Sequence, residues 1–267
     1  MTDLLALVAT QQPRLAFALA SFAGAMRNRM TGRWPAVREV ETLFPDLSHR
    51  RAVRVAAAIG ALDERNDVFV RCVRRGDIDR VRPSVAIPEA LRRIDGPCIL
   101  GTFHVGAFQT IGVMLEALGK PVLAFRDGIL FTPRPPVELQ STKGSAQKRT
   151  ASFIKAVDYL NRGGLVLMAL DAAPAATIAT ECLNRPFLLA RGAFALSRMT
   201  AAPIVPLAVR WARKGTEVVV GDPLQGDADN YEQALAAAAA RWLDRYLRES
   251  PSELGLGLLR ELLYRSV

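Results

Sequence analysis

The sequence predicts a single α/β domain in which a mixed, mostly parallel sheet is flanked by helices. The chain has 267 residues, half of them hydrophobic and 23% charged, which suits one large globular domain. From residue 85 onward, short apolar runs alternate with helical patterns. Residues 165–170 are apolar on both faces, as a strand buried in a parallel sheet requires. We therefore expect a helical N-terminal part (1–80) and an α/β core with C-terminal helices (81–267).

The first helical segment is apolar but short. Residues 3–26 are mostly apolar, with a polar interruption at 11–14. The clean run that remains, of about 12 residues, falls short of the roughly 20 needed to span a bilayer, and its flanks do not predict a signal peptide. Arg27, Arg29 and Arg33 follow it. Such a helix either packs on the domain or lies on an anionic membrane surface.

A longer helical pattern covers residues 50–75. Polar residues interrupt it at 63–67, which predicts a break into two helices. His49, among arginines at the start of this pattern, is expected to be a solvated surface residue.

The core elements follow in order, joined by right-handed crossovers. A long polar connection covers residues 127–148, and such a loop is uncommon in a compact domain unless it serves a site. Residues 172–186 are expected to be irregular. The sequence predicts strands at 98–103, 121–125, 165–170, 204–209 and 217–220, and helices at 88–93, 105–118, 150–161, 191–199, 230–248 and 251–265.

Polar side chains follow three of these strands directly: His104, Arg126 and Asp171. The carboxyl ends of parallel strands meet at the edge where open α/β sheets bind ligands, so we expect the three to converge. Gly106 would let a substrate approach the backbone. Arg126 could hold a phosphate, and Asp171 could position an acceptor, pair with Arg126 or cap a turn.

The net charge of +9 suits nucleic acid, an anionic membrane surface, or an acidic or phosphorylated partner. Lys143, Lys148 and Arg149, with Lys155 nearby, form a basic cluster. It could receive the phosphates of coenzyme A or an acidic acyl carrier protein, or simply be a solvated face. The sequence has neither interleaved aromatic and basic residues nor a helix-turn-helix pattern, so nucleic acid is not expected as a partner.

Several cofactor classes are not expected. The three cysteines are far apart and only two histidines are present, which predicts neither a disulfide framework nor a metal site and favours a reducing compartment. The glycine-rich patterns typical of nucleotide-triphosphate and dinucleotide enzymes do not occur.

The segment from His104 to Gln109, after a strand containing Gly101, resembles the H-x-x-x-x-[DE] box of glycerolipid acyltransferases. It is most similar to the lipid A biosynthesis (late) acyltransferase branch, where the box commonly reads G-H-F-G-N-W-E. The resemblance covers roughly residues 40–265, and the order and spacing of the blocks carry it. Further similar blocks lie at 43–47, 123–126, 167–171, 184–188, 192–197 and 202–206.

The resemblance implies a glycerolipid-acyltransferase-like fold and transfer of a fatty acyl group from acyl carrier protein or coenzyme A. The acceptor would be an amine or hydroxyl group on a lipid or metabolite, with His104 as general base. The thioester is a co-substrate, and no cofactor or metal is implied. A cytoplasmic location is expected, with possible peripheral contact with the inner face of an anionic membrane.

Gln109 departs from the family pattern, in which a carboxylate orients the histidine and stabilises the imidazolium. If a helix began near His104, Gln109 would lie about one turn away and could fix a tautomer, but it would supply no negative charge. This predicts a slower enzyme, an acceptor that needs less base catalysis, such as an amine, or loss of catalysis. The alternative function is an impaired homologue that binds acyl thioester or lipid without transfer.

Overall fold

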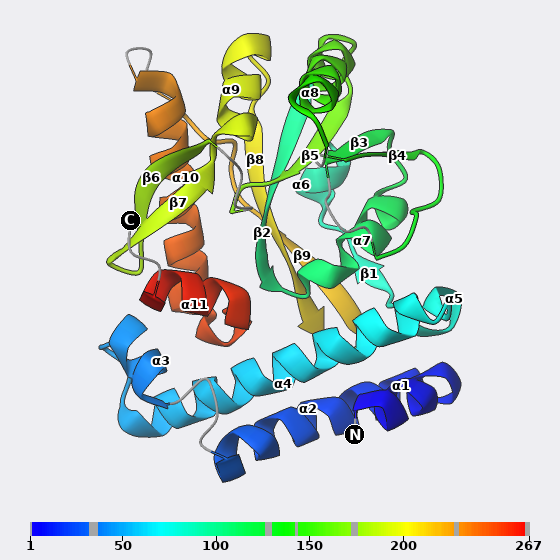
Figure 1. The fold of residues 1–267 in the computed structure, drawn as a ribbon, viewed down its shortest axis with the longest axis vertical. Helices are drawn as coiled ribbons and strands as arrows, with labels where there is room; N and C mark the ends of the chain where they lie inside the picture. The colour runs from blue at the N-terminus through cyan, green and yellow to red at the C-terminus, as the bar shows by residue number, and fades with distance from the viewer. Residues whose placement is uncertain are drawn as a thin grey trace.

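A seven-stranded sheet occupies the centre of the molecule, with helices on both of its faces (Figure 1). The computed structural model describes residues 2–31, 37–125, 130–141, 144–171, 176–226 and 230–264, without the side chains at 10, 14 and 27–31. All neighbouring strands are parallel except β8 and β9, which confirms the predicted single α/β domain with a mixed, mostly parallel sheet. The strand order is β1 (Val85–Ala86), β9 (Gly215–Val220), β8 (Ile204–Ala212), β2 (Cys98–Gly106), β5 (Leu165–Ala169), β3 (Val122–Phe125) and β4 (Val137–Gln140).

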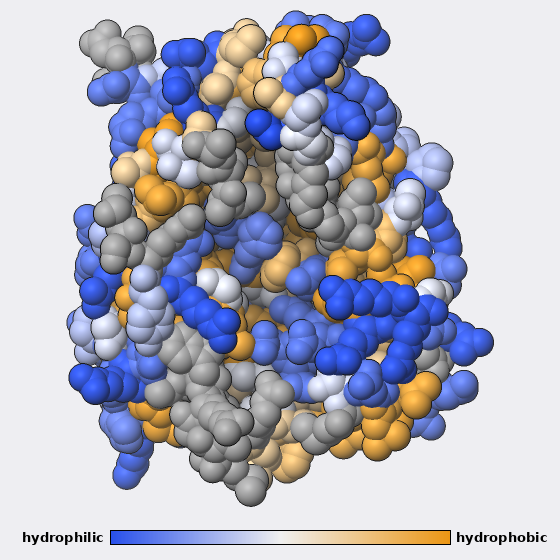
Figure 2. Space-filling model, viewed as in Figure 1, coloured by the Kyte–Doolittle hydropathy of each residue, from blue (hydrophilic) through white to orange (hydrophobic). Residues whose placement is uncertain are grey.

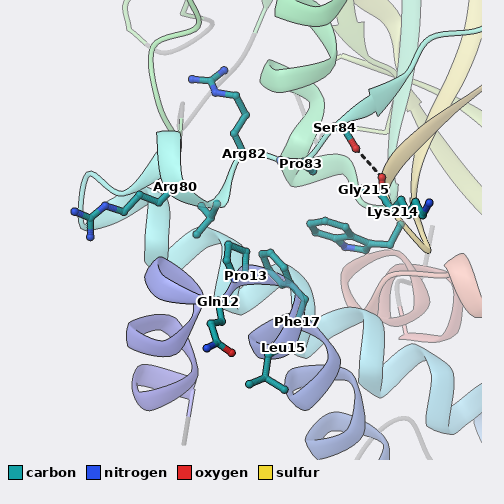
Figure 3. A pocket seen from close by; sticks show the side chains of 12 residues that line it. Gln12, Pro13, Leu15, Phe17, Arg80, Arg82, Pro83, Ser84, Lys214 and Gly215 are labelled. Atoms are coloured by element: carbon teal, nitrogen blue, oxygen red, sulfur yellow. Dashed lines mark hydrogen bonds between the residues drawn. The ribbon is translucent and has the colours of Figure 1, made fainter.

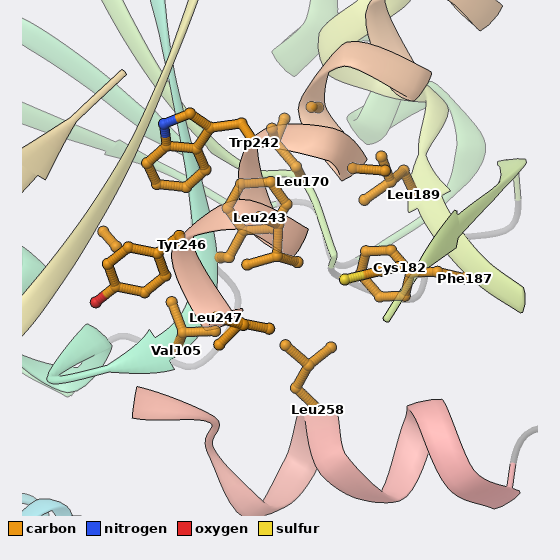
Figure 4. Packing of buried hydrophobic residues seen from close by; sticks show 14 of the residues in the cluster. Val105, Leu170, Cys182, Phe187, Leu189, Trp242, Leu243, Tyr246, Leu247 and Leu258 are labelled. Atoms are coloured by element: carbon orange, nitrogen blue, oxygen red, sulfur yellow. The ribbon is translucent and has the colours of Figure 1, made fainter. Parts of the chain in front are cut away.

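Successive residues of the central strands point to opposite faces and so build two cores. In β2, Ile99 and Phe103 enter the larger core, while Cys98 and Leu100 enter the smaller one. Figure 4 shows part of the larger core, in which Trp242 and Leu243 of α10 pack beside Leu170. The larger core is covered by α8 (Ala146–Asn161), α9 (Arg191–Thr200), α10 (Tyr231–Glu249) and α11 (Leu256–Tyr264), and the smaller by α6 (Glu89–Arg92) and α7 (Ile111–Leu118).

The N-terminal helices form a separate layer at the lower edge of Figure 1. A third core joins α1 and α2 to α4, and a Cβ added at Gly24 of α2 would collide with the carbonyl oxygen of Gly60 in α4. Among the described residues, no helix is both long and apolar enough to cross a membrane. The bounds are α1 (Thr2–Gln11), α2 (Pro13–Thr31), α3 (Val37–Leu43), α4 (His49–Arg74) and α5 (Ile78–Val81).

Three local predictions are wrong. The helix α4 continues through 63–67 without a break. The connection at 127–148 contains β4, which extends the sheet beside β3. The segment predicted to be irregular contains an antiparallel hairpin of β6 (Thr177–Cys182) and β7 (Arg185–Ala190). In β4 and β6 polar residues interrupt the apolar ones, and half-exposed strands of this kind have a weaker apolar signal than buried ones.

A fourth correction concerns the segment after His104. The strand β2 does not end at Phe103 but runs on to Gly106, and only a short 3₁₀ turn, Phe108–Thr110, separates it from α7. The backbone of this extension is tied to β8, since Ala107 N–H donates to the carbonyl of Val209 at 2.6 Å. His104 is therefore a strand residue and not the first residue of a helix.

Candidate active site

The parallel register of β2 and β5 brings His104 and Asp171 together. Thr102 of β2 is paired with Ala169 of β5. His104, within β2, and Asp171, just after β5, each lie two residues further along. Because side chains alternate with a period of two, residues two positions beyond a pair are again neighbours on one face. The convergence of these two predicted residues at the carboxyl edge thus follows directly from the sheet.

The Asp171 carboxylate holds His104 through two hydrogen bonds. Oδ1 lies 2.8 Å from Nδ1 of the ring, and Oδ2 accepts from the backbone N–H of His104 at 2.7 Å. The Asp171 side chain is 2% exposed, whereas that of His104 is 43% exposed. A carboxylate only accepts hydrogen bonds, so it places the ring proton on Nδ1 and leaves the lone pair on Nε2. This is the arrangement of an oriented general base.

His104 and Asp171 line a pocket of about 410 Å³. The ring of Phe108 meets the imidazole edge-on, with centroids 4.7 Å apart, and restricts its rotation. The wall formed by α4 contributes Ile59, Leu62, Asp63, Asn66 and Asp67, and the wall at the start of α11 contributes Gly255, Leu256, Gly257, Leu258 and Glu261. The pocket therefore combines carboxylates near the histidine with aliphatic side chains on both walls.

Gln109 lines the same pocket, but it is not the partner of His104. Among the described contacts it forms no hydrogen bond with the imidazole, and Asp171 occupies Nδ1. The expected one-turn spacing fails because β2 continues past the histidine, so residues 104 and 109 are not on one helix. The preference for an amine acceptor that was inferred from a missing carboxylate consequently loses its premise.

Gly106 has a packing role and not the expected open approach for substrate. Its φ is +58°, and an added Cβ would collide with the Val209 carbonyl oxygen and lie 2.6 Å from Glu253 Oε2. On the same peptide, Asn66 Nδ2 donates to the Gly106 carbonyl at 2.9 Å, while Asn66 Oδ1 accepts from Trp211 Nε1 at 2.9 Å. The backbone two residues beyond His104 is thus fixed from three elements.

None of the other predicted binding residues is among the described residues that line this pocket. Arg126 and Lys143 lie outside the described residues. Lys148 and Arg149 lie in the first turn of α8 and do not contribute to the described lining, and the Arg149 guanidinium donates to the carbonyl of Gly144 at 2.7 Å. Lys155 is paired with Glu138. The phosphate-binding role expected of the basic cluster remains a prediction.

Sequence reasoning missed the wall formed by α4. Asn66 and Asp67 lie three and four residues after Asp63, so all three reach the pocket from one side of the helix. The polarity of these residues predicts a helix break, whereas in the structure it marks the side of α4 that faces the pocket. A polar patch inside an otherwise apolar helix can equally mark the side that faces a polar cavity. The α11 wall gave no local signal.

A buried carboxyl group lies behind the site. Burial raises the pKa of Glu253 from 4.5 to about 7, although Arg210 and Arg65 oppose the shift. In the unfolded chain the proton leaves near pH 4.5, and in the folded chain near pH 7. The contribution of this group to stability therefore falls as pH rises from 4.5 to 7 and is constant above that range.

We expect Glu253→Gln to remove the fall in stability that Glu253 causes as the pH rises from 4.5 to 7. Relative to the wild type, its free energy of unfolding should rise by up to about 3 kcal/mol between about pH 5 and about pH 8. Urea unfolding at several pH values measures the change. Glu89→Gln, at an exposed position of α6, serves as the control and should follow the wild-type profile. Parallel profiles for wild type and Glu253→Gln would contradict the prediction.

No protein-family model matches the chain, and no curated protein is similar in sequence. Among solved structures, the chain is similar to the crystal structure of the 1-acyl-sn-glycerophosphate (LPA) acyltransferase PlsC from Thermotoga maritima. The TM-score is 0.38 at 8% identity, and the alignment covers 88% of this chain and 97% of that chain.

Proposed function

We propose that this protein transfers a fatty acyl group from an acyl thioester, carried by acyl carrier protein or coenzyme A, to an amine or hydroxyl acceptor. The observation that carries the proposal is the buried Asp171 carboxylate bound to Nδ1 of a half-exposed His104, at the edge of a pocket with apolar walls. The resemblance of residues 104–109 to an acyltransferase box supports the same reaction. The Asp171 contact favours catalysis over binding without transfer.

The proposed reaction uses His104 as base and then as acid. The oxygen or nitrogen of the acceptor attacks the thioester carbonyl carbon, and Nε2 of His104 accepts the proton that this atom loses. The tetrahedral intermediate collapses with cleavage of the C–S bond, and the proton passes from Nε2 to the departing thiolate. Asp171 keeps the Nδ1 proton in place and stabilises the imidazolium formed between the two steps. Atoms and charge balance without a further reactant.

Polar groups that can bind the acceptor line the pocket of His104. Asp63, Asp67, Asp171 and Glu261 are among its described lining residues. Carboxylates accept hydrogen bonds from hydroxyl or ammonium groups. We therefore propose an amine or hydroxyl group of a lipid or metabolite as acceptor.

The acyl chain would lie along the aliphatic walls. Ile59 and Leu62 on α4 face the pocket together with Leu256 and Leu258 on α11. Leu256 is partly exposed, and the other three are buried just behind the pocket wall beside the histidine. Peripheral contact with an anionic membrane is part of the proposal, because it would bring a lipid acceptor to this pocket.

The test is incubation of the purified protein with a panel of acyl thioesters on acyl carrier protein and on coenzyme A, together with amine and hydroxyl acceptors. Mass spectrometry should detect an acylated product with the wild type. His104→Ala should lower its rate of formation by about 10²–10⁴ because the general base is lost. Product from no pairing, with retained thioester binding, would support the binding-only alternative instead. Equal rates for wild type and His104→Ala would remove the histidine from the mechanism.

A further inference from the structure

Exposed apolar side chains gather on the two N-terminal helices. Of the large hydrophobic residues exposed in the described part of the chain, most lie on α1 and α2, at positions three to seven residues apart along each helix. Figure 2 shows hydrophobic surface along the lower edge of the molecule, where Figure 1 places these helices. The residues are Leu4, Leu7, Leu15, Leu19 and Phe22, which we call the α1–α2 apolar face.

A second pocket, of about 580 Å³, adjoins this face and shares Leu15 with it. It lies between α2, the segment from Arg80 to Ser84, and the turn joining β8 to β9. Pro13 and Phe17 form its apolar centre with Trp211, whose ring centroid is 5.2 Å from that of Phe17 (Figure 3). The pocket shares no lining residue with the pocket of His104.

The rim of this second pocket is basic. Arg80, Arg82 and Lys214 line it, while no aspartate or glutamate is among its described lining residues. Figure 3 shows Arg80 and Lys214 extending at opposite sides of the apolar centre. Arg82 is paired with Asp79 and Glu116, but Arg80 and Lys214 are exposed and form no ion pair among the described residues. Two unneutralised cations thus flank an apolar hollow at the border of an apolar face.

We propose that this pocket binds an anionic phospholipid of the membrane on which the α1–α2 apolar face rests. The apolar centre would take the upper part of a lipid acyl chain, and Arg80 and Lys214 would contact phosphate groups at the interface. Long basic side chains reach the headgroup level while their stems stay on apolar surface. Basic residues near an anionic leaflet strengthen binding, and apolar residues at helix positions of this kind enter the interface. This site is independent of the acyl-transfer chemistry.

Vesicle co-sedimentation tests the charged rim. The wild type should bind vesicles containing phosphatidylglycerol more tightly than vesicles of phosphatidylcholine alone. Arg80→Gln/Lys214→Gln should weaken binding to the anionic vesicles about thirtyfold. The matched pair Arg162→Gln/Arg241→Gln, which removes the same charge from exposed residues beside α8 and on α10, should weaken it less than about threefold. If both pairs weakened binding to the anionic vesicles equally, the effect would come from net charge alone, and the proposed site would be wrong.

A second pair of variants tests the apolar face. Leu19→Ser/Phe22→Ser should weaken binding to both kinds of vesicle by at least about tenfold. Ile154→Ser/Met199→Ser removes exposed apolar side chains from α8 and α9 and should leave binding unchanged. If neither pair weakened vesicle binding, or if both weakened it equally, the α1–α2 apolar face would not be the surface that rests on the membrane. His104→Ala should bind vesicles like the wild type, which separates this proposal from the proposed reaction.

Occupancy of the pocket is read from Trp211. In a Trp34→Phe background, two of the three tryptophans remain, and Trp242 is buried in the larger core. Phosphatidylglycerol with brominated acyl chains should quench the emission of Trp211, and Arg80→Gln/Lys214→Gln should abolish the quenching. Unquenched emission on fully bound protein would exclude the pocket. Binding of acyl carrier protein that depends on Arg80 and Lys214, with unchanged vesicle binding, would assign the pocket to a protein partner instead.

Discussion

Asp171→Asn is expected to lower the turnover of acyl transfer by about 10⁴, the loss seen for the equivalent change in serine proteases. The two side chains have nearly the same shape, so the buried site should still fold. An amide at this position can donate to Nδ1 of His104, which stabilises the tautomer whose proton is on Nε2. That tautomer cannot accept a proton from the acceptor group, and the negative charge that stabilises the imidazolium is also lost. Steady-state turnover of the purified variant measures the effect, with thermal unfolding as the check on folding.

Gln109 provides the matched control at a second polar residue of the same pocket. We expect Gln109→Ala to change turnover by less than about tenfold, because Gln109 does not hold the ring. Gln109→Glu should leave N-acylation nearly unchanged and should not raise O-acylation by orders of magnitude, because Asp171 already supplies the carboxylate. An effect of Gln109→Ala as large as that of Asp171→Asn would return Gln109 to the catalytic pair.

Gly106→Ala is expected to destabilise the fold by about 2–5 kcal/mol. A left-handed backbone is unfavourable for alanine, and its Cβ would also be forced against the Val209 carbonyl and the Glu253 carboxyl group. Relief of the clash must move the segment that begins at His104, so turnover should fall in molecules that remain folded. Urea unfolding gives the change in stability, and turnover below the unfolding transition gives the change in activity.

Gly119→Ala separates the strain of a left-handed backbone from the clash of the added Cβ. Gly119 ends α7 with a φ of +69°, but a Cβ there would have no neighbour within 4 Å. This variant should lose only about 1–2 kcal/mol, from backbone strain, and keep its turnover. If Gly106→Ala were no more damaging than Gly119→Ala, the close packing behind His104 would not contribute to the site.

Much of the fold could be predicted because its signals are local. The apolar stretch of β5 and the period of the helices report burial directly, so the class of fold and most core elements followed from residue patterns. The errors have local causes as well. The half-exposed strands β4 and β6 lack a continuous apolar run. Within residues 63–67 of α4, Asp63, Asn66 and Asp67 face a cavity instead of ending the helix.

The catalytic pair shows where local patterns reach their limit. Residue order alone was enough to predict that His104 and Asp171 lie toward the carboxyl ends of two strands, and hence near one edge of a sheet. The order of those strands comes from packing between segments that are distant in the chain. Only the folded sheet sets β5 beside β2 in a register that joins Asp171 to the histidine. The H-x-x-x-x-[DE] motif suggests Gln109 as the partner of His104 because a motif is defined by spacing along the chain. A hydrogen bond depends on distance in space, and the folded chain brings Asp171 to the ring instead.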